Sequence, residues 1–170
     1  YMSLMNVVYA EAAAAFEELT LNNRDDELVW QVKGAWPNIF RKARFLSAVD
    51  HIQLDRLRYK TMKVMDEVFS KVDMMVGPFM VGPMLVITNF TGHPCLHLRA
   101  GFSRTKTRGE ASLGSGSINT GEEDAQSEIL HETPQGISLW SGLFNEGRLC
   151  NLGAALEKQL NVWQHRPPIG

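Results

Sequence analysis

The stretch TNFTGHPCLHLRAGF, residues 88–102, decides the fold that we predict. Residues 91–94 combine glycine with proline, the two residues that most often place a turn between regular elements. Residues 95–99 are short, mostly apolar and closed by Gly101, which is typical of a buried strand. Residues 84–90 are also short and apolar, but their spacing favours neither a helix nor a strand.

Further strands are predicted on both sides of this stretch. Residues 74–76 are apolar and end at Gly77-Pro78, and residues 136–140 have strand composition. Between the strands, at about residues 103–133, the chain is rich in Gly, Ser, Thr and Glu. We expect a long surface excursion there, with a hairpin as one option.

Helical spacing dominates both ends of the chain. Apolar residues recur at helical intervals over residues 4–19 and 146–160. Asp25 or Asp26 is expected to cap a short helix that continues to residue 33. Beyond Pro37, no glycine or proline occurs up to residue 72, which predicts one long helix or two nearly continuous ones.

An apolar stripe along residues 37–72 includes Val49, Leu57 and Val64. Helices combined with short strands predict the α/β class, with a mixed sheet flanked by helices. Three short strands make a small sheet, so we expect strands from elsewhere to join it. Self-association through an exposed sheet edge or an apolar surface is therefore predicted.

Composition narrows the functional classes. The net charge of −2 argues against a general nucleic-acid binder, which needs a clustered positive surplus. No window approaches the roughly 18 uninterrupted apolar residues of a membrane span, and no signal peptide is recognisable. Cys95 and Cys150 are too few for a disulfide framework, so we expect a cytoplasmic protein with free thiols.

Four segments, taken in order, resemble the amidase signature family. Residues 43–58 are similar to the helix that precedes the family's late strands, and residues 72–78 match its Asp-apolar-apolar-x-x-Pro strand. Residues 88–102 contain its Asn-x-Thr-Gly-x-Pro turn and the following apolar strand. Residues 134–157 are similar to its closing strand, glycine turn and last helix. The resemblance covers roughly residues 36–160.

The resemblance implies the C-terminal part of the amidase signature fold, and residues 1–170 are interpreted as a single portion of such a domain. Family members cleave carboxamide C–N bonds through a serine nucleophile activated by a lysine and a second serine, without a cofactor. Those residues lie upstream of the segments that match, and no Gly-Gly-Ser-Ser segment occurs in this sequence. We therefore expect no catalytic residue here and no amidase activity of this chain alone.

Five residues are predicted to shape the pocket for a small-molecule amide. Asn89, Thr91 and Gly92 belong to the turn that lies near the site in this family. Trp140 ends a strand beside Ser141-Gly142, although most such tryptophans only fill a core. Arg44 would reach an anionic substrate group, or would simply face solvent.

The chain departs from the family pattern at several positions. Arg99 stands where the family usually has proline, and the polar excursion is longer than in many members. Glutamine-using members carry an acidic residue where this chain has Gly82, which puts a glutamine-type substrate in doubt.

Two rival hypotheses stay open. One is a non-catalytic binding or structural module that kept the sheet of the amidase fold. The other is a small zinc protein that uses His93, Cys95 and His97, because alternate residues of a strand share a face and these are zinc-ligand types. Only three such ligands are local, so a fourth would have to come from elsewhere in the chain.

Overall fold

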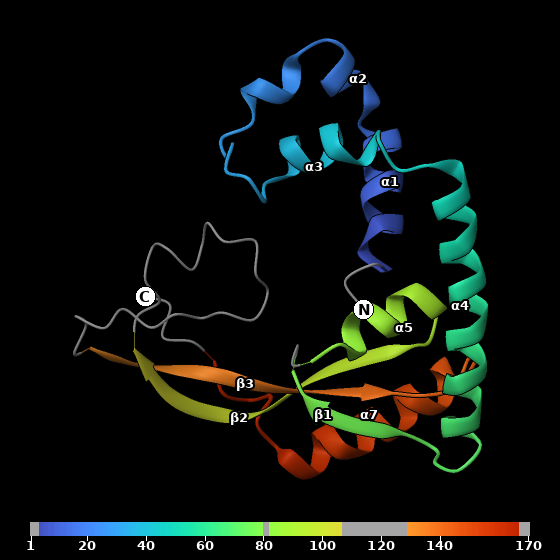
Figure 1. The fold of residues 1–170 in the computed structure, drawn as a ribbon. Helices are drawn as coiled ribbons and strands as arrows, with labels where there is room; N and C mark the ends of the chain where they lie inside the picture. The colour runs from blue at the N-terminus through green and yellow to red at the C-terminus, as the bar shows by residue number, and fades with distance from the viewer. Residues whose placement is uncertain (1–3, 80–81, 107–128, 167–170) are drawn as a thin grey trace. The chain divides into compact units, whose positions relative to one another are not determined.

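The structure is a computed structural model that describes residues 4–79, 82–106 and 129–166 (Figure 1). Within these ranges, residues 4–60 belong to one compact unit and the remaining residues to a second. The long helix α4, Ala48–Phe69, contributes to both units. None of the helices described has the length and apolar content that crossing a membrane requires. Residues 107–128 of the predicted polar excursion lie outside the described residues.

The first unit consists of short helices. They are α1 (Met5–Ala15), α2 (Glu17–Leu21), the 3-10 helix η2 (Arg24–Glu27), α3 (Trp36–Ala43) and the first part of α4. The α3 helix packs against α1 and α2. Its Phe40 is buried, with ring centroids 5.5 Å from Phe16 and 5.7 Å from Trp36. Phe40 is the buried member of this aromatic cluster, whereas Phe16 and Trp36 cover it from the surface, at 51% and 48% exposed.

The region predicted as one long helix or two is divided into α3 and α4. Pro37 lies in the first turn of α3, where its missing N–H leaves no bond unmade. Ser47 begins α4, because its Oγ accepts a hydrogen bond from the Asp50 N–H at 3.0 Å and donates one to the Asp50 carboxylate at 2.7 Å. This reciprocal cap starts a new helix at Ala48. Of the two predicted alternatives, two nearly continuous helices is therefore the correct one.

The predicted helix from Asp25 or Asp26 to residue 33 is wrong. Only the 3-10 turn η2 forms, and Leu28 is already extended. The Asp25 carboxylate is buried and forms an ion pair with Arg41 Nε at 2.7 Å, so it does not cap a helix. The Gln31 side chain donates instead to the carbonyl oxygens of Asp25 and Leu28, both at 2.9 Å, and holds the segment as a loop.

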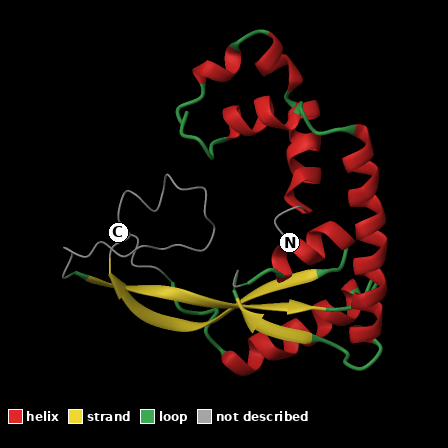
Figure 2. Ribbon diagram, viewed as in Figure 1, coloured by secondary structure: helices red, strands yellow, loops and turns green. Residues whose placement is uncertain are grey.

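The second unit is built on a three-stranded sheet, drawn in yellow in Figure 2. Its strands are β1 (Met75–Pro78), β2 (Cys95–Lys106) and β3 (Leu130–Trp140), in the order β1-β3-β2. Both pairings are antiparallel, so among the described residues the sheet is not mixed as predicted. The strands β2 and β3 are much longer than residues 95–99 and 136–140, because they form a hairpin that enters the predicted excursion. A register shift between Arg99 and Gly101 marks a bulge in β2.

Two helices complete the unit: α5 (Met84–Thr91), which resolves the ambiguous segment as helical, and α7 (Glu146–Leu160). They lie on opposite sides of the sheet (Figure 1). The α7 helix packs against β2 and β3. It approaches closely because Gly153 has no side chain, and a Cβ there would overlap Leu96 and lie 3.8 Å from a methyl group of Leu139. Leu139 is fully buried, which stabilises the fold by about 1.5–3 kcal/mol.

Substitution of Gly153 with leucine should therefore loosen α7 from the sheet. We expect Gly153→Leu to lower the free energy of unfolding by about 1–3 kcal/mol, as overpacking does in other cores. Gly147→Leu is the matched control in the same helix, because no atom lies within 4 Å of a Cβ at that position. Urea unfolding followed by circular dichroism measures both, and equal effects of the two substitutions would contradict the packing described here.

Candidate functional site

The turn that joins α5 to β2 forms one end of the candidate site. Gly92 ends α5 in the left-handed conformation, at φ 81°, which glycine adopts without a steric penalty. The N–H groups of Gly92 and His93 both donate to the carbonyl oxygen of Thr88, at 2.8 and 3.0 Å. These two hydrogen bonds to one carbonyl oxygen hold the turn through which the chain passes from α5 into β2.

Thr91 and His93 interact through their side chains. Thr91 Oγ1 donates to the carbonyl oxygen of Ile87 at 2.9 Å and lies 2.7 Å from His93 Nδ1. Since the hydroxyl has one proton to give, the Nδ1 of His93 is then the donor in the second bond. The His93 ring is 6% exposed and stacks on Phe69 of α4, with centroids 5.4 Å apart.

Burial lowers the pKa of His93 below its usual value, and the negative charge of Asp66 partly opposes this shift. The neutral imidazole is therefore the form that the folded chain favours. A neutral ring also suits its stacking on Phe69 and its bond to a threonine hydroxyl.

The turn after β3 lies against the α5–β2 turn. The Ser141 N–H donates to the carbonyl oxygen of Pro94 at 3.4 Å, and Ser141 Oγ donates to the Asp73 carbonyl oxygen at 3.2 Å. A Cβ on Gly92 would lie 3.8 Å from Leu143, in ordinary contact. We call Phe69, Thr91, Gly92, His93 and Ser141 the sheet-end cluster.

A second group of polar side chains lies on neighbouring positions of β2 and β3. His97 Nδ1 lies 2.9 Å from Ser138 Oγ, and His97 Nε2 lies 3.7 Å from Cys95 Sγ. Ser138 is 0% exposed, so a substrate carbonyl has no access to its hydroxyl. Burial raises the pKa of the Cys95 thiol, which disfavours the nucleophilic thiolate. Neither pair has the features of an activated nucleophile.

The zinc hypothesis finds little support in this arrangement. Cys95 and His97 are neighbours, but His93 is buried and its Nδ1 is occupied by Thr91. Among the residues that the structure describes, no group of three or more His, Cys, Asp or Glu side chains is placed to hold a metal ion.

The predicted pocket residues fall into different surroundings. Thr91 and Gly92 belong to the sheet-end cluster, whereas exposed Asn89 donates back to the Leu85 carbonyl oxygen at 2.8 Å. Trp140 is 4% exposed, at the end of β3, between Met75 and Cys95 in register. Arg44 belongs to the first unit, where it forms an ion pair with Glu17 at 3.0 Å.

Sequence patterns did not indicate Phe69 or Ser141 as part of the site. His93 was noticed only as a potential metal ligand. The signal available in the sequence was the turn at Gly92. Because α5 ends there, His93, the next residue, folds back against the side chain of Thr91.

Comparison of the chain with protein-family models, with curated proteins and with solved structures finds no match.

His93 should make stability depend on pH. Its pKa is lowered in the folded chain, so the unfolded state binds the proton more readily. The free energy of unfolding therefore decreases as the pH is lowered below about 6.5. His93→Phe keeps a ring beside Phe69 and removes the titrating group, so we expect a flatter pH dependence between about pH 7 and pH 5.

Urea unfolding at several pH values measures this difference. His51→Phe, at an exposed position of α4, is the control for losing a histidine as such. If wild type and His93→Phe lose stability in parallel over this pH range, the inference that His93 is buried in its neutral form is wrong.

Proposed function

We propose that this chain supplies the C-terminal part of an amidase-like hydrolase that cleaves small carboxamides without a cofactor. The observation that carries the proposal is that three of the four segments resembling the amidase signature family, residues 72–78, 88–102 and 134–157, fold as neighbours within the second unit. The strands β1 and β2 each pair with β3, and α5 and α7 lead into and out of this sheet. Segments that are separate in the sequence thus form one continuous piece of structure.

Exposed apolar side chains support a larger assembly. The stripe predicted along α4 is not covered, since Val49 is 66% exposed and Val64 is 57% exposed. Val76 in the outer strand β1 is 57% exposed. Apolar surface of this kind is typical of a contact with another part of a protein. In the proposed enzyme, the part that carries the nucleophile covers it.

Trp140 adds a second, independent argument. Its indole N–H is buried and has no hydrogen-bond partner among the described residues. A buried donor left unpaired costs about 1–3 kcal/mol. An acceptor from the rest of the enzyme, or the carbonyl of a bound amide, would remove this cost, which keeps Trp140 the strongest pocket residue of the five proposed.

The chemistry also requires another segment. A serine hydroxyl becomes nucleophilic only beside a base, and the developing oxyanion needs preorganised donors. The hydroxyl of Ser138, the serine of the serine–histidine pair described above, is inaccessible to a substrate, and we assign catalysis to residues outside this chain. A cytoplasmic location is part of the proposal, because Cys95 and Cys150 are free thiols.

The purified chain should therefore not hydrolyse amides. The reading frame upstream of Tyr1 should encode a lysine and a Gly/Ser-rich segment with the nucleophile, and the longer protein should release ammonia from small carboxamides. Ammonia release is measured for both proteins on the same amide panel, and the longer protein is treated with a serine-directed fluorophosphonate as a control.

Two outcomes would overturn this proposal. One is saturable hydrolysis by the 170-residue chain in several independent preparations. The other is a longer protein that folds but releases no ammonia from any amide of the panel, or whose activity survives the fluorophosphonate.

The isolated chain should self-associate through the outer strand β1. An uncovered strand edge with an apolar side chain pairs readily with another chain, and a charge there prevents it. We expect Val76→Lys to shift the chain toward monomer in sedimentation velocity. Val29→Lys, at a position that is 94% exposed in the first unit, is the control, and an equal effect of both substitutions would exclude β1 as the contact.

A further inference from the structure

A half-open cavity of about 430 Å³ lies at the surface of the first unit. It is bounded by α1, by the turn at Lys33-Gly34 and by the end of α3 with the residues that follow it. Tyr9, Ile39 and Leu46 give it an apolar lining. Cavities of this size hold small organic ligands in other proteins.

The charged groups of the cavity are both lysines. Lys33 and Lys42 line it, and no Asp or Glu does. Two arginines of the same unit are paired, Arg41 with Asp25 and Asp26 and Arg44 with Glu17. Among the described residues, neither lysine has a carboxylate within 4 Å. Their positive charge is therefore left for an anion from solution.

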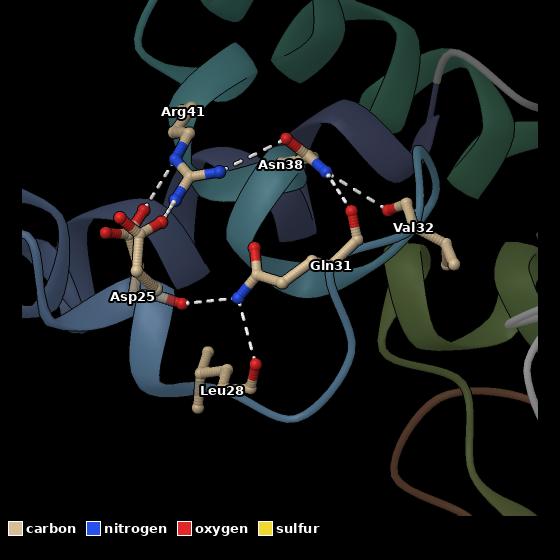
Figure 3. A network of polar contacts seen from close by, with 7 residues as sticks. Asp25, Leu28, Gln31, Val32, Asn38 and Arg41 are labelled. Carbon is tan, nitrogen blue, oxygen red and sulfur yellow. Dashed lines mark hydrogen bonds and ion pairs between the residues drawn. The ribbon is translucent and has the colours of Figure 1, made fainter.

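A polar network fixes the loop that carries Lys33 (Figure 3). Asn38 Nδ2 donates to the carbonyl oxygens of Gln31 and Val32, at 3.0 and 3.1 Å, and Asn38 Oδ1 accepts from Arg41 at 3.3 Å. The loop is thereby tied to α3. Lys42 Nζ donates to the Lys33 carbonyl oxygen at 3.3 Å, which holds its ammonium group at the cavity and leaves it further protons to donate.

We propose that this cavity binds a small amphipathic carboxylate. The apolar body of the ligand packs against Tyr9, Ile39 and Leu46. Its carboxylate accepts charge-assisted hydrogen bonds from Lys33 and Lys42, which are stronger than bonds between neutral groups. The amide of Asn6, which also lines the cavity, offers a further donor. The loop held by Asn38 and the Lys42 ammonium held on the Lys33 carbonyl oxygen reduce the entropy lost on binding.

Octanoate and 1-octanol distinguish the two parts of this proposal, because they share an apolar chain and differ in charge. Each is titrated into the wild-type chain by isothermal calorimetry, and the amide NMR signals of Gly34 and Ala43 report the place of binding. We expect saturable binding of octanoate to one site, shifts at both amides and clearly weaker binding of octanol.

Three variants and a control test the residues. Lys33→Gln and Lys42→Gln should each weaken octanoate about threefold to fivefold, as for exposed charge pairs, without changing octanol binding. Ala43→Leu narrows the cavity and should weaken both ligands. Lys158→Gln, on α7 in the other unit, should change neither.

The proposal is overturned if octanoate does not saturate, or if octanol binds as tightly. It is also overturned if Ala43→Leu, folded by circular dichroism, binds octanoate like the wild type. None of these outcomes depends on amide hydrolysis.

Discussion

The strand β3 accepts and donates hydrogen bonds along both of its edges, and the second unit depends on this double pairing. In its register Trp140 lies between Met75 and Cys95, and Ser138 lies between Gly77 and His97. A slip of one residue would bring every side chain of the strand to the opposite face. Leu139 would then leave the contact with α7, and Ser138 would leave His97. The burial of Leu139 thus fixes the position of the polar residues beside it.

The sequence predicted the centres of these elements better than their limits. Residues 74–76, 95–99 and 136–140 have local apolar patterns, and all of them except Met74 lie in strands. The outer half of the hairpin has no such pattern, because pairs between its two strands hold it, such as Thr105 with Thr133 at 2.9 Å. Contacts between residues so far apart leave no local signal. The apolar spacing of residues 84–90 did not distinguish a helix from a strand. In the helix α5 that forms, the hydroxyls of Thr88 and Thr91 donate to carbonyl oxygens of the preceding turn.

The site was predictable to the same extent. The turn at Thr91 and Gly92 follows from glycine and proline in four residues, and it is where the sequence placed it. The stack of His93 on Phe69 joins residues from two elements and depends on how α4 meets the sheet. The absence of the predicted helix after Asp25 has a similar cause, because Arg41, the partner of Asp25, lies on a helix that begins eleven residues after it, at Trp36. An ion pair with a buried carboxylate outweighed the local tendency of Asp25 to cap a helix.

This ion pair does more to specify the first unit than to stabilise it. Removing a carboxylate from water costs free energy that a nearby guanidinium only offsets, so a buried pair contributes little net stability. It does require that Asp25 and Arg41 meet, since the buried Asp25 carboxylate without its partner would be strongly destabilising, whereas the Arg41 side chain is 37% exposed. The requirement draws η2 against α3, and the intervening loop must then close between them, with Gln31 and Asn38 satisfying its carbonyl groups. The place of Lys33 beside Lys42 follows from this closure, because the loop has no helix of its own to position it.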